Sequence, residues 1–258
     1  LEFRRVLFRS GKKEGQVVVA GPRGTFFALL WRETALFLRN PVFLTNGLLN
    51  LFFPPVIVFF LLRSNLNTLP VTIPLFYLEL IAIGYLAALP VLTVLPATSI
   101  SREGKQFWLS RLIPISPQVQ VLAKLLWSCI ATLLGGLLSL VVLGFLFKLS
   151  FMTLARALVI GFVGSIGVGA LSILIDSLWP NLQWTDPQKA MKGNLTGLYA
   201  MLAGGLYLAG IALLTAKLIE LWSPGAILAL LLLIFLVGDL IFWWLLARRA
   251  PMLYWQEN

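Results

Sequence analysis

The chain has 258 residues, of which 59% are hydrophobic and 12% are charged, whereas soluble globular domains carry about 25% charged residues. Several apolar stretches exceed the roughly 20 residues that a helix needs to cross a bilayer, and they lack the alternation of barrel strands. These properties exclude a soluble domain and predict an all-α membrane protein, in which the net charge of +10 belongs to loops at the inner surface and not to a nucleic-acid interface.

The first ten residues, LEFRRVLFRS, resemble the translation of a common sequencing-library adapter over their whole length. We therefore expect residues 1–10 to be an artefact and the natural protein to extend further at its N terminus. The alternative is a genuine basic amphipathic leader. Residues 11–24 are polar and rich in glycine, which indicates a linker.

An amphipathic helix is predicted from Thr25 onwards, because TFFALLWRETALFLRNP mixes apolar with charged residues and ends at Pro41. Such a helix lies in the plane of the membrane interface, where arginine and tryptophan side chains suit the headgroup level. The alternative is that this stretch is only the start of the first span. The candidate interfacial residues are Trp31, Arg32, Glu33 and Arg39.

Six transmembrane helices are predicted within one domain that covers residues 25–249. The spans are expected at about 42–62, 73–98, 121–147, 154–174, 195–216 and 226–247, with a tail at 250–258. Pro54 and Pro55 are expected to kink or break the first span. Small residues recur at helix-packing intervals, as in Gly135 with Ser139, Gly161 with Ser165 and Gly169, and Gly205 with Ala209.

The distribution of lysine and arginine predicts that both termini are cytoplasmic. With the N terminus inside, thirteen of these residues beyond residue 10 lie on the inner side and four on the outer side, and inner loops are normally the richer in cations. The external connections are short, whereas the internal loops at 99–120 and 176–194 are longer. A soluble partner is therefore expected on the cytoplasmic side.

The chain contains no histidine and a single cysteine, Cys129. Catalysis by a histidine base, an HExxH metal site and an intrachain disulfide are therefore excluded. No G-x-x-x-x-G-K-[ST] motif for binding nucleotide phosphates occurs either. We expect a chain that is not an enzyme, that has no catalytic residues, cofactor or metal, and that does not bind nucleic acid.

Two acidic residues, Glu79 and Asp239, lie inside predicted spans, and ionisable groups at membrane depth are candidates for function. Glu79 lies near the outer end of its helix, where it could reach the interface in a structural role or serve a polar pathway. Asp239 is deeper and could pack on a small-residue face of a neighbouring helix. A proton-coupled carrier usually needs a cationic or acidic relay partner as well, and the spans reveal none.

A short cytoplasmic helix is predicted at about 101–113, inside the polar segment SISREGKQFWLSRLIPIS. Ser101 is a candidate cap, Glu103 would lie in the positive first turn, and Pro114 ends the helix. Its apolar residues recur about once per turn at Phe107, Trp108, Leu112 and Ile113. Because it joins two spans, this helix could transmit a push from a soluble partner. The alternative is a solvated loop with an interfacial tryptophan.

Two stretches resemble type-2 ABC export permeases. One is WRETALFLRNPVF, and the other is the loop with Glu103, Gly104, Lys105, Trp108, Pro114, Ile115, Ser116, Ala123 and Lys124. The resemblance implies a six-span permease domain in the bacterial cytoplasmic membrane, whose loop carries a coupling helix that docks on a separate ATPase. The docking residues that it implies are Arg102, Glu103, Gly104, Lys105, Trp108, Arg111, Leu112 and Pro114, with the interfacial helix as a second contact.

The implied function is to couple ATP hydrolysis in the ATPase subunit to export, with a second permease domain alongside. WPNLQWTDPQKAMKGN resembles a signature of large two-half permeases, which implies that this chain is the C-terminal half of a twelve-span protein. The chain departs from well-studied branches of the family in having only KLIELWSPG between the fifth and sixth spans. Two alternatives are a membrane-embedded assembly or regulatory subunit that conducts nothing, and a proton-coupled carrier that uses Glu79 and Asp239.

Overall fold

A computed structural model describes residues 22–65, 74–191 and 193–255. The chain is helical over these residues, with no strand among them. The helices are α1 (Pro22–Leu38), α2 (Pro41–Asn65), α3 (Leu75–Thr93), η1 (Pro96–Thr98), η2 (Ser101–Gln106), α4 (Phe107–Leu112), α5 (Pro117–Phe147), α6 (Phe151–Leu178), α7 (Pro187–Met191), α8 (Leu195–Leu218) and α9 (Pro224–Trp255).

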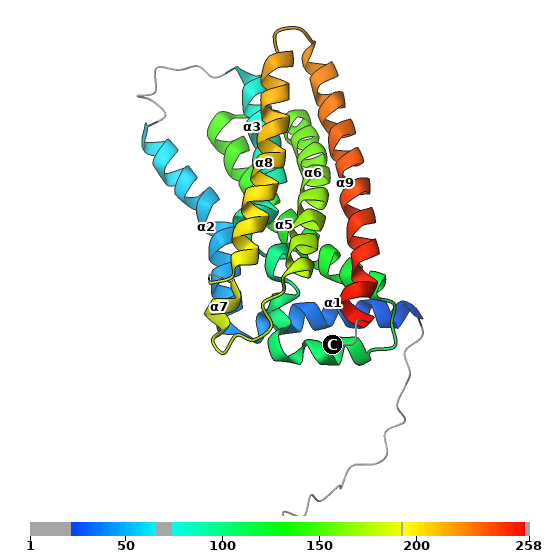
Figure 1. Ribbon diagram of the computed structural model, residues 1–258. Helices are drawn as coiled ribbons and strands as arrows, with labels where there is room; N and C mark the ends of the chain where they lie inside the picture. Colours follow the sequence, from blue (N-terminus) through cyan, green and yellow to red (C-terminus); the bar gives the residue numbers. More distant parts are fainter. Residues whose placement is uncertain (1–21, 66–73, 192, 256–258) are drawn as a thin grey trace, which may run out of the picture.

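Five of these helices, namely α3, α5, α6, α8 and α9, are long and apolar enough to cross a membrane. They lie side by side as a bundle (Figure 1). The prediction of an all-α, multi-pass membrane protein is confirmed at this level, because apolar helices satisfy their own backbone hydrogen bonds in lipid.

Helix α2 occupies the position of the predicted first span. Its apolar part, Pro41–Ile57, is shorter than the five helices above, so a sixth span stays a prediction. The helix continues through Pro54 and Pro55 without interruption, and its far half leans away from the bundle (Figure 1). A kink at proline, and not a break, is therefore the outcome.

Helix α6 is the central element of the bundle, in contact with α3, α5, α8 and α9. Its small residues make this possible, because Gly161 lies against Leu86 of α3 and Gly164 lies against Phe235 of α9. The predicted packing role of the α6 glycines is confirmed. The prediction for Gly205 is wrong, because no other described element comes within 4 Å of a Cβ atom placed there, whereas Gly197 and Gly204 of α8 pack against Val94 and Val91.

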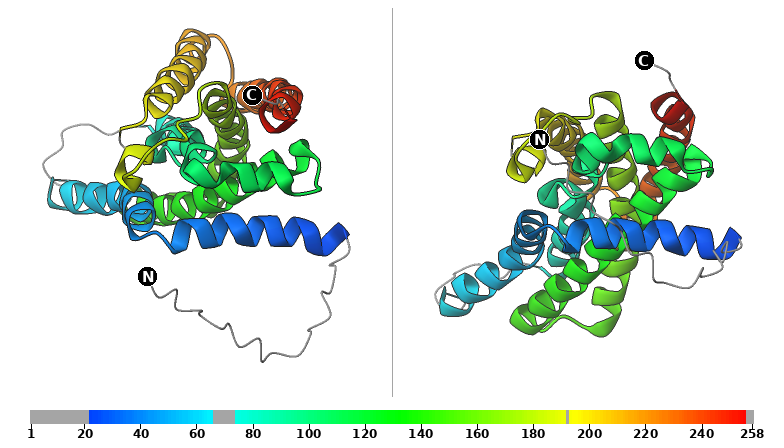
Figure 2. Two further views of the ribbon diagram at one scale, coloured as in Figure 1. Left: turned by 60° about the horizontal axis from the view of Figure 1, so that its bottom comes forward. Right: turned by 90° about the horizontal axis from the view of Figure 1, so that it is seen from below.

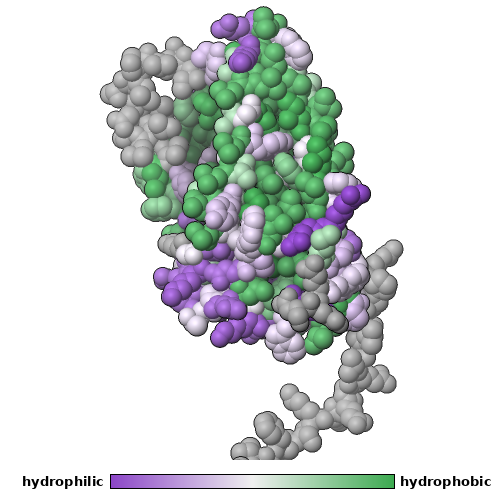
Figure 3. All heavy atoms as spheres, in the orientation of Figure 1, coloured by the Kyte–Doolittle hydropathy of each residue, from purple (hydrophilic) through white to green (hydrophobic). Residues whose placement is uncertain are grey.

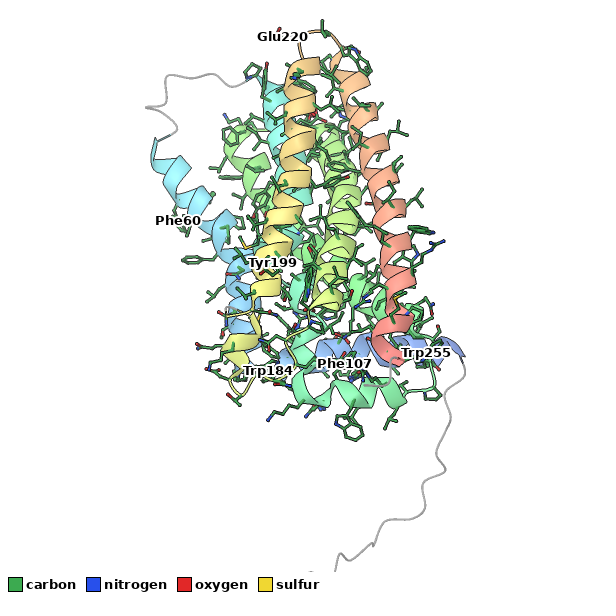
Figure 4. All side chains as sticks on the ribbon, in the orientation of Figure 1. Phe60, Phe107, Trp184, Tyr199, Glu220 and Trp255 are labelled. Atoms are coloured by element: carbon green, nitrogen blue, oxygen red, sulfur yellow. The ribbon has the colours of Figure 1, made fainter. Side chains whose placement is uncertain are left out.

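Helix α1 lies across one end of the bundle, roughly at right angles to the long helices (Figures 1 and 2). We call this the α1 end; it also holds α4, α7 and the last turns of α9 (Figure 1). Figure 3 shows hydrophilic residues gathered there below the apolar surface of the bundle. Phe107, Trp184 and Trp255 lie at the α1 end, whereas Glu220 lies at the opposite tip (Figure 4). A helix at right angles to the long helices is the arrangement that the predicted interfacial position of α1 requires.

Three long helices extend beyond their predicted bounds at the α1 end, and one of them, α5, begins at Pro117 instead of near residue 121. Helix α6 continues to Leu178 instead of ending near residue 174, which places Asp176 inside the helix. Helix α9 runs to Trp255, so most of the predicted tail at 250–258 is helical. Its last turns are ordered by packing, because Leu253 and Tyr254 are buried in the core of the α1 end.

The chain between α3 and α5 is buried from residue 95 to residue 104, although it carries the most polar segment of the sequence. Asp176 of α6 holds it in place. The carboxylate accepts hydrogen bonds from the backbone N–H groups of Ile100 (2.7 Å) and Ser101 (3.1 Å) and from the Ser101 hydroxyl (2.5 Å). These bonds satisfy donors that would otherwise be buried without partners.

Replacing Asp176 with alanine should destabilise the protein by about 3 kcal/mol or more, because several buried donors lose their acceptor. The matched control is Ser172→Ala, one turn earlier on the same helix, where the equally buried hydroxyl bonds only to Val168 of its own helix. That change should cost about 1 kcal/mol or less. Thermal unfolding in detergent measures both, and equal losses would contradict the tethering role of Asp176.

Candidate functional site

The predicted continuous helix at 101–113 is wrong. The segment consists of η2 followed directly by α4, and η2 is itself kinked at Gly104, whose positive φ of 53° is not helical. Ser101 does not cap a helix, because its hydroxyl donates to Asp176. The predicted end of the helix is confirmed, since Ile113 adopts an extended conformation before Pro114.

Gly104 needs to be glycine for two reasons. Its backbone conformation is one that residues with a side chain rarely adopt. A Cβ atom there would also lie 2.7 Å from the ring of Trp184. Trp184 in turn donates from its indole N–H to the Ser101 carbonyl (2.7 Å), so the loop before α7 clamps η2 from outside.

Glu103 is buried and lies at the centre of a charge network. Lys124 of α5 donates from Nζ to Glu103 Oε1 (2.5 Å) and to Glu33 Oε1 of α1 (2.6 Å), and its side chain is only 2% exposed. The same ammonium group also donates to the Ser99 carbonyl (3.3 Å). One buried lysine thereby joins α1, η2 and α5.

The second oxygen of Glu103 is held from α1 and α4. Arg32 of α1 donates to Glu103 Oε2 (2.8 Å) and to the Ser110 hydroxyl (2.6 Å), and that hydroxyl donates to the same carboxylate oxygen. Partial burial acts to lower the pKa of Arg32, but the charge of Glu103, the hydrogen bond to it and the charge of Glu33 act together in the opposite direction, so the pKa of Arg32 lies above its ordinary value. The negative charges of Glu33 and Glu103 are matched by the positive charges of Arg32 and Lys124. This pairing offsets the cost of removing the charges from water.

Arg102 faces a different part of the interior. It is buried, and its Nη1 donates to the Leu95 carbonyl (2.7 Å) and to the Thr98 hydroxyl (3.0 Å). Its guanidinium group lies over the rings of Trp127 (5.3 Å) and Phe37 (5.9 Å). The three consecutive candidates Arg102, Glu103 and Gly104 therefore fasten η2 to the bundle and present no docking surface.

The outer face of α4 is exposed and apolar. Trp108 is 57% exposed and Leu112 is 69% exposed, with Leu109 beside them. We call these three residues the α4 patch. The opposite face is fastened to α9, since the Phe107 ring packs on Tyr254 with ring centres 5.2 Å apart.

The remaining candidate residues in the loop differ in their exposure to solvent and in their contacts. Lys105 and Pro114 are exposed. Arg111 is half-buried; its Nη2 donates to the Leu253 carbonyl of α9 (3.2 Å), and its guanidinium group lies over the Phe107 ring. Trp31 of α1 and Arg39, which directly follows α1, are exposed, in contrast to Arg32 and Glu33 of the charge network.

Glu79 and Asp239, the two acids that the sequence places within spans, differ in their surroundings. Glu79 is buried and pairs with Arg156 of α6, which donates to both carboxylate oxygens (2.7 and 3.1 Å). The sequence revealed no partner for either acid in the spans, whereas the fold brings Arg156, 77 residues away, into an ion pair with Glu79. Asp239 packs against Gly167 of α6, as predicted, and its Oδ1 is buried without a hydrogen bond to any described residue.

Among the described residues, no group of three histidine, cysteine, aspartate or glutamate side chains is placed to hold a metal ion. No protein-family model, curated protein or solved structure matches this chain. The functional assignment therefore depends on the α4 patch and on the charge network behind it.

Replacing Lys124 with methionine should destabilise the protein by about 3–5 kcal/mol, because Glu33 loses its only described cationic partner while remaining buried. The double variant Lys124→Met/Glu33→Gln removes both charges, and Glu103 keeps its bond to Arg32. We expect it to recover most of the loss. Denaturant unfolding in detergent measures both, and a double variant no more stable than the single one would show that charge balance is not the cause.

Proposed function

We propose that the chain is the membrane-spanning permease subunit of an ATP-driven exporter in the bacterial cytoplasmic membrane, with the α1 end and both termini on the cytoplasmic side. The observation that supports the proposal is the α4 patch, an exposed apolar surface on a helix whose other face contacts buried residues. ATP hydrolysis would belong to a separate subunit, since the sequence lacks a phosphate-binding motif. A second permease domain, either the other half of a longer chain or another copy, would complete the pathway.

The contacts behind the α4 patch provide a mechanical route into the bundle. A displacement of α4 would move Ser110, whose hydroxyl donates to Glu103 of η2. The contacts of Glu103 and Ser110 with Arg32 would transmit this displacement to α1, and the ion pair of Glu103 with Lys124 would transmit it to α5. Asp176 would pass the same displacement to α6, the central helix. Closely packed elements of this kind respond to a push as rigid bodies, which is how ATPase closure would tilt the spans.

The carrier alternative is less well supported than the permease. It requires acids that exchange protons, and Glu79 is engaged by both donors of Arg156. Of these two acids, Asp239 is the one with a buried carboxylate oxygen, Oδ1, that has no hydrogen bond to a described residue. An assembly or regulatory subunit could use the same α4 patch, so it is distinguished from a permease by transport and not by binding.

Replacing both Trp108 and Leu112 with alanine should weaken binding of the ATPase subunit that the proposal requires by about thirtyfold or more, because buried apolar anchors contribute about 2 kcal/mol or more. Affinity is measured with both proteins purified in detergent. The matched control is Leu221→Ala/Trp222→Ala, an exposed leucine and tryptophan at the opposite end of the bundle. The control should bind as the unchanged chain does.

Equal affinity of the docking variant and the unchanged chain would place the contact elsewhere. Proteoliposomes that hold the complex separate the remaining alternatives. ATP-dependent transport that fails in the docking variant supports the permease, binding without transport supports the regulatory subunit, and gradient-driven transport abolished by Asp239→Asn supports the carrier.

A further inference from the structure

A pocket of about 970 Å³ opens at the α1 end, between the second half of α1, the start of α2 and the η2–α4 segment. We call it the basic pocket. The side chains that matter for its chemistry are Arg32, Arg39, Arg102, Lys105, Trp31 and Trp184. Four of the six are cations, and they come from segments that lie far apart in the sequence.

The basic pocket has a surplus of positive charge. Among the described residues, Glu103 is the only acid that lines it, and both oxygens of that carboxylate are already engaged by Lys124, Arg32 and Ser110. Arg39 and Lys105 are exposed and form no ion pair with any acid in the described ranges. Arg102 is 3% exposed, and its Nε has no hydrogen-bond partner within these ranges. The pocket therefore offers several N–H donors to an anion and no free acceptor charge against it.

The position of the pocket relative to the apolar surface indicates where its ligand comes from. The corner between α1 and α2, at Asn40 and Pro41, forms part of the wall, and apolar α2 leaves from this corner. Along one face of α1, Phe27, Trp31 and Leu38 are each more than half exposed. Exposed aromatic and aliphatic side chains on a helix that lies across the end of a membrane bundle mark the headgroup level.

We propose that the basic pocket binds the phosphate headgroup of an anionic phospholipid. The phosphate would lie between Arg39 and Lys105, and the acyl chains would run along the exposed apolar face of α1 beside α2. A lipid fits better than an acidic protein segment, because the pocket adjoins the surface at which apolar side chains are exposed. The inference does not depend on the proposed transport function.

The experiment compares which lipids stay bound after the full chain is extracted from vesicles of equal parts phosphatidylglycerol and phosphatidylcholine. Mass spectrometry of the purified protein gives the ratio of the two bound lipids. The unchanged chain should be enriched in phosphatidylglycerol. Arg39→Gln/Lys105→Gln should lower this enrichment by about thirtyfold, because two cations near an anionic headgroup contribute about 1 kcal/mol each.

The control variant is Lys189→Gln/Arg248→Gln, which removes two exposed cations at the same end that do not line the pocket. It has the same net charge as the test variant, and it should keep the enrichment. Both variants change exposed side chains, and their unfolding temperatures should match that of the unchanged chain. Unchanged enrichment in the test variant, or an equal loss in the control, would overturn the proposal. Loss of ATPase binding with lipid enrichment intact would also overturn it, by identifying the pocket as a protein contact.

Discussion

The buried carboxylate of Glu103 is the constraint on which the α1 end depends. A carboxylate in the interior is stable only if cations and hydrogen-bond donors surround it, and here they come from α1, α4 and α5 through Arg32, Ser110 and Lys124. Each of these elements is therefore held in place by the same group. The helix across the end of the bundle and the short helix below it form one unit because they share this anion.

A second buried carboxylate, Asp176, extends this unit to the centre of the bundle. It accepts from backbone donors of η2, so the polar segment after α3 is tied to α6 and not left in solvent. Gly104 then lets the chain turn out of the interior towards α4. The exposed α4 patch is therefore connected, through Ser110, Glu103 and Asp176, to helices in the interior of the bundle. Under the proposed function, these connections would transmit a force from a docked partner.

The two kinds of charge at the α1 end have separate consequences. Arg32 and Lys124 are neutralised by Glu103 and Glu33, and they hold helices together. Arg39 and Lys105 have no such partner among the described residues and remain exposed beside the basic pocket. Within η2, Arg102 and Glu103 are buried and Lys105 is exposed, and Gly104 lies between the buried and the exposed charges.

The sequence by itself determined the helical membrane class, the places of the long helices, the end of α4 before Pro114 and the packing role of the α6 glycines. These follow from local properties, namely the length of apolar runs, the conformational limits of proline and the size of glycine. Of the candidate docking residues, Trp108 and Leu112 have the exposure that the prediction needs, whereas Arg102 and Glu103 are buried, and docking itself stays a prediction. Only the tertiary structure decided which charges are buried, because Glu103 with Arg32, Glu79 with Arg156 and Asp176 with Ser101 are each separated by more than seventy residues. A charge can be buried only where its partner arrives, and no local pattern records a partner that distant.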